Sequence, residues 1–156
     1  MAALQYVHSK NVIHRDVKPE NLVFASNGYA KLTDFGIAKT RRRDNAVETS
    51  GTPSYMAPEV IFRQPHGFEV DFYAVGVICH EMMLLRRPYN GRTRKELRAE
   101  MLAYRCEVDL DELPEGWDPE VVDFINSLLE RRPHKRLGFS GASQVKRHPW
   151  LSCIDW

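Results

Sequence analysis

The stretch VIHRDVKPENLVF, residues 12–24, decides how this chain is interpreted. Apolar residues stand at both of its ends, and charged and amide side chains crowd between them. The apolar runs favour short strands or core positions, so the polar residues are confined to a connection between them. Such a cluster is either a solvated turn or a functional site, and the rest of the sequence has to decide between the two.

The composition limits the class of protein. The chain has 156 residues, of which 43% are hydrophobic and 28% charged, which suits one domain with its own core. A formal net charge of +1 argues against a nucleic-acid partner. The longest apolar stretch, residues 70–85, is too short and too charged for a bilayer, so we expect no membrane partner. Three cysteines without paired spacing favour reduced thiols, and we expect a cytoplasmic location.

The hydrophobic pattern predicts a mainly α-helical domain with one small β-hairpin. We expect helices over residues 2–11, 68–84, 91–105, 118–132 and 141–151. Two short apolar runs on either side of a turn at Asn27-Gly28 form the hairpin. From Gly36 to about Pro58 no period is visible, which predicts a long irregular loop; loops longer than about 15 residues are usually functional or disordered.

Three acidic or amide side chains surround the predicted hairpin. Asp16 and Asn21 come before its first strand, and Asp34 follows its second. Because a short hairpin brings its two ends together, these side chains can converge, and a few hard oxygen ligands suit Mg²⁺ shared with phosphate groups. Lys18 can place a positive charge on a phosphoryl group there, and Asp16 is the natural group to accept or orient a hydroxyl proton.

These residues resemble a known family. HRDVKPEN, residues 14–21, resembles the catalytic loop of eukaryotic protein kinases of the Ser/Thr type, with Val17 where leucine is commonest. DFG at 34–36, GTPSYMAPE at 51–59 and RPHKRLG at 132–138 follow in that family's order. The resemblance covers essentially all of residues 1–156 and implies the helical C-terminal lobe of a protein kinase-like fold, in which the β-hairpin carries the catalytic and metal-binding loops. The last two motifs favour the cyclic-nucleotide-dependent and calcium-calmodulin-dependent branches.

The resemblance implies a transferase that moves the γ-phosphoryl group of ATP to Ser or Thr hydroxyls of protein substrates, with ATP and Mg²⁺ as cofactors. By it, Asp16 is the catalytic base and Lys18 steadies the γ-phosphate. Asn21 and Asp34 stand at the two Mg²⁺-ligand positions. Val23 forms the floor of the adenine pocket.

Five further residues are structural by the same resemblance. His14 and Phe35 link the metal site to the core and are anchored by Asp71. Glu59 pairs with Arg136 and ties the long loop to the helical body. We expect that ion pair to be buried, so that losing one partner costs on the order of 3 to 5 kcal/mol.

The long loop, called the activation segment here (residues 34–59), holds the regulatory candidates. By the resemblance Arg15 receives a negative charge from it, and Thr52 lies next to the catalytic aspartate. Two hypotheses remain open for the charge: Glu48 supplies a fixed carboxylate, or Thr49, which is followed by Ser50, takes a phosphate. We favour Thr49, because a phosphate carries up to two charges and three acceptors.

Two acidic residues bear on the substrate. Glu20 and Glu81 match positions that bind an arginine upstream of the target residue in basophilic kinases, which favours basic substrates.

No glycine-rich phosphate loop and no strand lysine of the kinase N-terminal lobe occur within residues 1–156. We therefore expect an N-terminal lobe, or another protein, to cover the nucleotide face, and we expect the 156 residues alone not to catalyse. The alternative is an inactive, kinase-derived structural or interaction module within an assembly.

Overall fold

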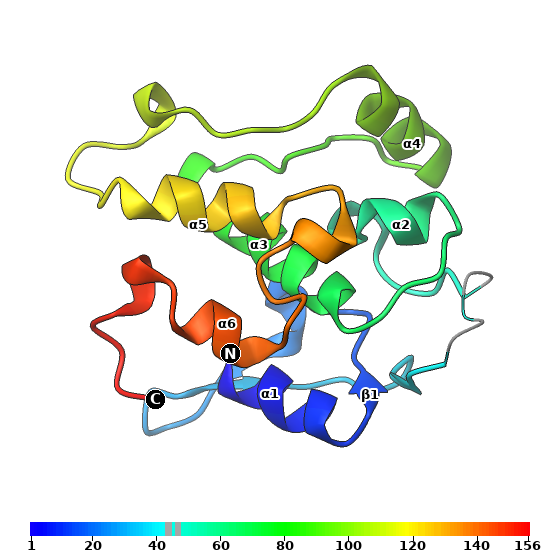
Figure 1. Ribbon diagram of the computed structural model, residues 1–156, viewed down its shortest axis with the longest axis horizontal. Coiled ribbons are helices and arrows are strands. Elements are labelled where there is room, and N and C mark those ends of the chain that lie inside the picture. Colours follow the sequence, from blue (N-terminus) through cyan, green and yellow to red (C-terminus); the bar gives the residue numbers. More distant parts are fainter. Residues whose placement is uncertain (43–44, 46–47) are drawn as a thin grey trace.

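The computed structural model describes residues 1–42, 45 and 48–156. Within these residues the chain forms six α-helices and two small antiparallel sheets (Figure 1). The mainly helical class predicted from the sequence is confirmed. No helix in this described part of the chain is long and apolar enough to cross a membrane.

The helices and strands have the following bounds. The helices are α1 (Ala2–Ser9), α2 (Pro58–Ile61), α3 (Glu69–Leu84), α4 (Arg94–Ala103), α5 (Glu120–Leu128) and α6 (Ala142–Lys146). The strands are β1 (Val12–Ile13), β2 (Leu22–Phe24), β3 (Ala30–Leu32) and β4 (Lys39–Thr40), and the 3-10 turns used below are η1 (Pro19–Asn21), η3 (Pro53–Tyr55) and η4 (Leu110–Glu112). The last predicted helix is shorter than expected, because Pro149 has no amide hydrogen and begins a separate 3-10 turn.

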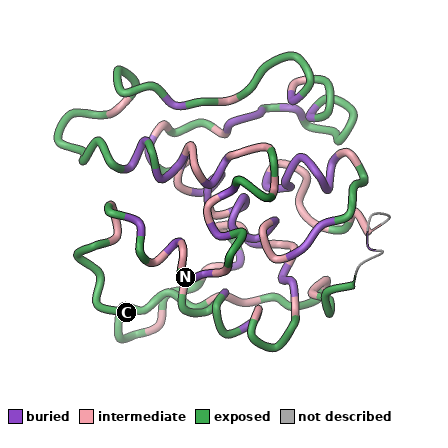
Figure 2. Tube along the Cα trace, viewed as in Figure 1, coloured by how far each residue is buried: buried purple, intermediate pink, exposed green. Residues whose placement is uncertain are grey.

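Helix α3 lies at the centre of the core. Its sequence is apolar almost all round, and ten of its sixteen residues are buried. In Figure 1, α4 and α1 lie at opposite ends of the molecule with α3 and α5 between them, and Figure 2 shows the buried residues concentrated in this middle region. The contact of α3 with α5 depends on Gly76, where an added Cβ would come within 2.8 Å of the Leu128 Cβ.

The predicted hairpin is present and positions the polar residues around it. β2 pairs with β3, with Leu22 opposite Leu32 and Phe24 opposite Ala30. The Thr33 amide donates to the Asn21 carbonyl over 2.9 Å, which extends the pairing by one step. Asp34 therefore follows directly after a residue that is bonded to Asn21, so the two metal-ligand candidates leave the same end of the hairpin.

A second sheet was not predicted from the sequence. β1 pairs with β4, with Ile13 opposite Lys39, so the stretch expected to be irregular from Gly36 onward contains a strand. Two-residue strands carry no periodicity that a sequence pattern can show. The pairing places Lys39 beside the segment that follows Ile13, where the polar cluster begins.

Candidate active site

Asp16 is the hub of the polar cluster. Its Oδ1 accepts hydrogen bonds from the Thr52 amide (3.0 Å) and the Thr52 hydroxyl (2.7 Å). Its Oδ2 lies 2.8 Å from the Lys18 Nζ and accepts from the Asn21 Nδ2 over 3.1 Å. The Lys18 ammonium also donates to the Thr52 hydroxyl over 2.8 Å. Three other residues predicted for the site thus contact the Asp16 carboxylate, which holds it in a single orientation.

The protonation states of this pair follow from the contacts. Burial opposes ionisation of Asp16, but hydrogen bonds from Lys18 and Thr52 outweigh it, and the pKa of Asp16 is lowered. The hydrogen bond to Asp16 raises the pKa of Lys18, and the nearby charges of Glu20 and Asp34 add to this. At neutral pH the pair is therefore a carboxylate and an ammonium, and Asp16 is free of a proton.

Asn21 and Asp34 supply oxygen donors at the end of the hairpin. The Asn21 amide nitrogen also donates to the Asp16 carbonyl over 2.8 Å, so its oxygen remains as an acceptor. Asp34 is exposed, has φ +61°, and accepts from the Gly36 amide with one carboxylate oxygen over 3.0 Å. Among the described residues no group of three or more His, Cys, Asp or Glu side chains could enclose a metal. One amide and one carboxylate fit Mg²⁺, which keeps waters and phosphate oxygens in its coordination shell.

Buried Asp71 supports the backbone before the site. Its carboxylate accepts from the His14 amide (2.9 Å) and the Arg15 amide (2.8 Å), and it lies 2.8 Å from the His8 Nε2. Arg15 has φ +69°, a left-handed conformation that a non-glycine residue adopts at a cost. The two amide bonds to Asp71 hold it there. His8 was not predicted as a partner, and only the fold brings it to Asp71.

His14 connects this support to the metal-ligand end. The His14 ring is fully buried, and it packs edge-on against the Phe35 ring with 4.8 Å between ring centroids. Its Nε2 lies 3.1 Å from the Thr33 carbonyl, one residue before Asp34. The catalytic-loop candidates and the Asp34 turn are therefore joined through one histidine.

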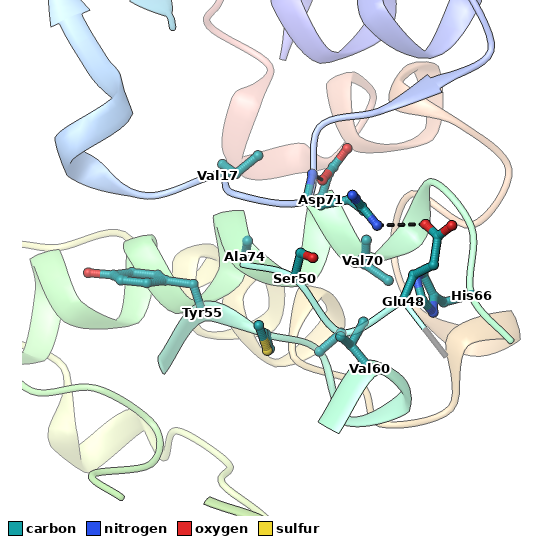
Figure 3. Close-up of a pocket in the computed structure, with 12 residues that line it drawn as sticks. Val17, Glu48, Ser50, Tyr55, Val60, His66, Val70, Asp71 and Ala74 are labelled. Atoms are coloured by element: carbon teal, nitrogen blue, oxygen red, sulfur yellow. Dashed lines mark hydrogen bonds and ion pairs between the residues drawn. The ribbon is translucent and has the colours of Figure 1, made fainter. Parts of the chain in front are cut away.

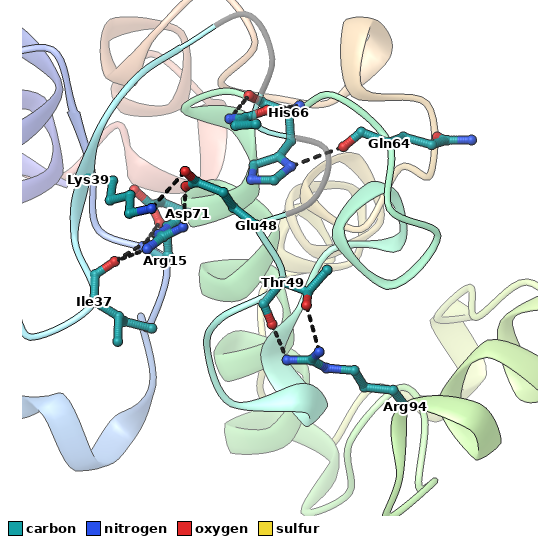
Figure 4. Close-up of polar contacts among 10 residues, drawn as sticks. Arg15, Ile37, Lys39, Glu48, Thr49, Gln64, His66, Asp71 and Arg94 are labelled. Atoms are coloured by element: carbon teal, nitrogen blue, oxygen red, sulfur yellow. Dashed lines mark hydrogen bonds and ion pairs between the residues drawn. The ribbon is translucent and has the colours of Figure 1, made fainter.

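The Arg15 side chain faces the activation segment. Its Nη1 donates to the Glu48 Oε2 over 2.7 Å, and its Nε donates to the Ile37 carbonyl over 2.8 Å (Figure 4). Lys39 donates to the other Glu48 oxygen over 2.7 Å. The bond from Lys39 is the largest cause that lowers the pKa of Glu48. The sequence did not indicate Lys39, whose place depends on the β1–β4 pairing.

Neither Thr49 nor Ser50 is among the hydrogen-bond partners of Arg15. Thr49 receives hydrogen bonds from Arg94 of α4, at its hydroxyl (2.7 Å) and at its carbonyl. Ser50 is exposed and, with Glu48 and His66, lines a small cavity beside Arg15 (Figure 3). The carboxylate of Glu48 therefore pairs with Arg15, and Thr49 is hydrogen-bonded to Arg94.

Glu20 and Glu81 lie near one phenol. The Tyr55 hydroxyl donates to the Glu81 Oε2 over 2.6 Å. Burial raises the pKa of Tyr55, and the bond to Glu81 and the charges of Glu81 and Glu20 raise it further. Arg87 lies 3.7 Å from Glu81, so that carboxylate is partly neutralised.

Val23 and the Glu59–Arg136 pair occupy opposite environments. Val23, on β2, is 46% exposed, so its apolar side chain lies open at the surface of the hairpin.

Glu59 and Arg136 are fully buried and form a bidentate ion pair, with Nη1–Oε1 at 2.6 Å and Nη2–Oε2 at 2.9 Å. Arg136 also donates to the carbonyls of Glu130 and Glu69, which joins α2 to the start of α3 and to the segment after α5.

The sequence is similar to that of known proteins along almost its whole length. The family model of the protein kinase domain matches residues 1–151. The chain is 35% identical over 156 residues to a probable serine/threonine-protein kinase of Dictyostelium discoideum, 34% over 158 to a cAMP-dependent protein kinase, catalytic subunit-like, of Caenorhabditis elegans, and 38% over 157 to ribosomal protein S6 kinase 2 alpha of Gallus gallus.

These matches cover 99%, 100% and 98% of this chain but only 33%, 38% and 20% of the respective relatives. The chain therefore spans two fifths or less of each of these proteins. The family model alone takes in most of the sequence, including every residue of the polar cluster described above. The chain belongs to the protein kinase family and is of serine/threonine-kinase lineage.

Proposed function

We propose that the protein transfers the γ-phosphoryl group of ATP to Ser or Thr hydroxyls of protein substrates. The observation that carries this proposal is the set of contacts at Asp16, whose two oxygens meet Thr52, Lys18 and Asn21. A carboxylate that is kept ionised and in one orientation suits a hydroxyl whose proton must be accepted during transfer.

Each side chain has a proposed role. Asp16 orients the substrate hydroxyl and accepts its proton, since its lowered pKa leaves it unprotonated at neutral pH. Lys18, held between Asp16 and Thr52, places its ammonium where charge develops on the γ-phosphoryl group. Asn21 and Asp34 would hold Mg²⁺ through the amide and carboxylate oxygens described above. The metal, when bound, neutralises phosphate charge and orients the phosphates.

We propose that residues 1–156 form the C-terminal lobe of a kinase domain. The exposed Val23 then forms the floor of the adenine site, and an N-terminal lobe or another protein covers it. Electrostatic stabilisation of the transferred group depends on excluding water, so the open lobe alone should be inactive. We propose a cytoplasmic location and no nucleic-acid or membrane partner.

The substrate proposed is a basic protein segment. Glu20 is exposed, and its charge and that of Glu81 both act on Tyr55, so the two carboxylates lie in one neighbourhood. A substrate arginine can displace the Arg87 contact, which at 3.7 Å is long for an ion pair. We infer a preference for arginine upstream of the phosphorylated residue, the property of the basophilic branches.

A second candidate is an inactive interaction module. The observation that favours it is the apolar surface of the hairpin, where Phe24 is 79% exposed and Tyr29 is 73% exposed. The two candidates differ in what the Asp16 network is for. A module that only binds a partner has no need of an ionised carboxylate bonded to Thr52 and Lys18.

Kinase assays on the full-length protein with Mg²⁺-ATP test the proposal. Peptides with Ser, Thr or Tyr as the acceptor, with and without upstream arginine, identify the substrate class. We expect transfer to Ser or Thr, preferentially in basic peptides, and a fall of about 10³-fold on Asp16→Asn. Asp111→Asn, at an exposed carboxylate in η4, is the matched control. Equal activity of Asp16→Asn and the control would refute the proposed role of Asp16.

A further inference from the structure

The activation segment is attached to α4 by one arginine. Arg94, the first residue of α4, donates from Nη1 to the Thr49 hydroxyl over 2.7 Å and from Nη2 to the Thr49 carbonyl. Figure 4 shows the Arg94 side chain reaching from its helix toward Thr49, with both bonds drawn. The two residues are 45 positions apart, so the contact joins two separate parts of the fold.

The helix that carries Arg94 is held rigidly at this end. The Thr93 side chain accepts from the Glu96 amide, and the Glu96 carboxylate accepts from the Thr93 amide, each over 3.2 Å, which is a complete capping box. Buried Leu97 and Met101 pack α4 into the core. α4 also packs against η3, the turn directly after Thr52. Arg94 is therefore presented from a well-supported position.

The first two residues of this helix carry the charge that is unfavourable at an N-terminus, although Glu96 at the third position is favourable. The N-terminus of a helix carries a partial positive charge and favours acidic residues. Here its first two positions are Arg94 and Lys95. A residue that is unfavourable for its own helix is expected where its side chain makes a contact elsewhere in the fold. Arg94 makes such a contact with Thr49. Exposed Lys95 has no side-chain bond recorded among the described residues.

The segment after Thr49 leads directly to Asp16. Gly51 has φ +128°, and a Cβ there would come within 2.6 Å of the Arg15 carbonyl, so the chain passes close against the catalytic loop. Thr52 then binds Asp16 through both its amide and its hydroxyl. Among the described residues, the bonds from Arg94 to Thr49 are the only recorded side-chain hydrogen bonds that join residues 48–52 to α4.

We propose that Arg94 is a positioning residue for the protein substrate, because by holding Thr49 it sets the place of Thr52 against Asp16 and Lys18. This inference rests on the proposed phosphotransfer. Val23 and Asp34, proposed for the adenine site and for Mg²⁺, make no recorded bond with residues 48–52, whereas Lys18, proposed to act on the γ-phosphoryl group during transfer, donates to Thr52. The effect of Arg94 should therefore appear in kcat/KM for the protein substrate and not in KM for ATP.

Kinetics of the full-length protein test this role. For Arg94→Ala we expect kcat/KM for a serine peptide to fall about fivefold, the size of one lost hydrogen-bonded contact, with KM for ATP unchanged. Arg94→Lys should restore activity only in part, since an ammonium cannot replace both guanidinium bonds. Lys95→Ala is the matched control, as it removes the neighbouring exposed charge and should have no effect on kcat/KM.

Two further readouts separate positioning from a loss of folding. Arg94→Ala removes a cation from the N-terminus of α4, so the melting temperature of the protein should be unchanged or slightly higher. Amide hydrogen exchange over residues 48–52 should become faster in Arg94→Ala but not in Lys95→Ala. The effect of Arg94→Ala on kcat/KM should also be smaller in a Thr49→Ala background, because part of the contact is already gone.

The outcomes are distinct. If Arg94→Ala matches Lys95→Ala in kinetics and exchange, the inference is wrong. If it lowers the melting temperature and affects ATP and peptide alike, Arg94 is only structural, which also overturns it. If the wild-type protein transfers no phosphate to any peptide, the proposed function fails instead. In that case the exchange measurement alone decides whether Arg94 holds the segment.

Discussion

Arg15 and Glu48 form an ion pair, with 2.7 Å between Nη1 and Oε2 and side chains only 5% and 19% exposed. Lys39 holds the second Glu48 oxygen at the same distance. Of the two sources of negative charge predicted for Arg15, Glu48 and a phosphorylated Thr49, the carboxylate of Glu48 is the one that contacts it. Thr49, the source of negative charge that the sequence favours, is instead bonded to Arg94.

The first prediction concerns this ion pair. We expect the full-length protein to keep its kinase activity after complete dephosphorylation by a phosphatase, because Glu48 supplies the charge without modification. Glu48→Gln should lower kcat/KM about tenfold, the effect of losing a charge-assisted hydrogen bond. Activity is measured on a serine peptide, with mass spectrometry to verify that no phosphate remains. Loss of activity on dephosphorylation would instead support a phosphorylated Thr49.

The second prediction concerns the pH dependence of activity. Asp16 must be ionised to act, and its pKa is lowered from the ordinary value of 3.8, with Lys18 and Thr52 as the causes that outweigh burial. The acidic limb of the wild-type profile should therefore lie below the range set by an ordinary aspartate. Lys18→Met removes the stabilising charge, so the pKa of Asp16 rises and the limb moves to higher pH.

The profile of kcat/KM against pH, normalised for each variant, is the measurement. Lys31→Met, at an exposed position on β3, is the control and should leave the limb in place. An identical limb in the wild-type protein and Lys18→Met would contradict the assignment of Asp16 as the titrating base.

The third prediction concerns stability. Glu59→Gln leaves the fully buried Arg136 without its carboxylate, which should lower the free energy of unfolding by about 3 kcal/mol. Arg132→Ala removes a pair with Glu130 in which the arginine side chain is 54% exposed, and should lower the free energy of unfolding far less. Urea denaturation compares the two variants. Equal costs would show that burial of the Glu59 pair has no energetic consequence.

Local patterns in the sequence are sufficient to predict much of the fold. The hairpin and α3 were predicted correctly because a turn at Asn27-Gly28 and an apolar run from 68 to 84 each act within a short window. The β1–β4 pairing was missed, since strands of two residues leave no pattern. Spacing around the hairpin also indicated that Asp16 and Asn21 would meet, which they do.

The partners of the cluster could not be predicted in the same way. Lys39 reaches Glu48 through a strand pairing, and Arg94 reaches Thr49 across 45 positions of sequence. Neither lysine nor arginine stands out locally, because charged residues at the surface are common. The choice between Glu48 and Thr49 as the partner of Arg15 likewise depends on side-chain directions, which only the folded chain defines.

Phosphoryl transfer at the end of the hairpin should require Asp34, the proposed Mg²⁺ ligand. Single-turnover transfer from Mg²⁺-ATP to a serine peptide is measured for the full-length protein and for Asp34→Ala, with thermal unfolding as a check on folding. We predict transfer by the wild-type protein and a loss of at least about 10³-fold in Asp34→Ala at unchanged stability. Equal rates in the two proteins, or no transfer by a folded wild-type protein, would contradict the account.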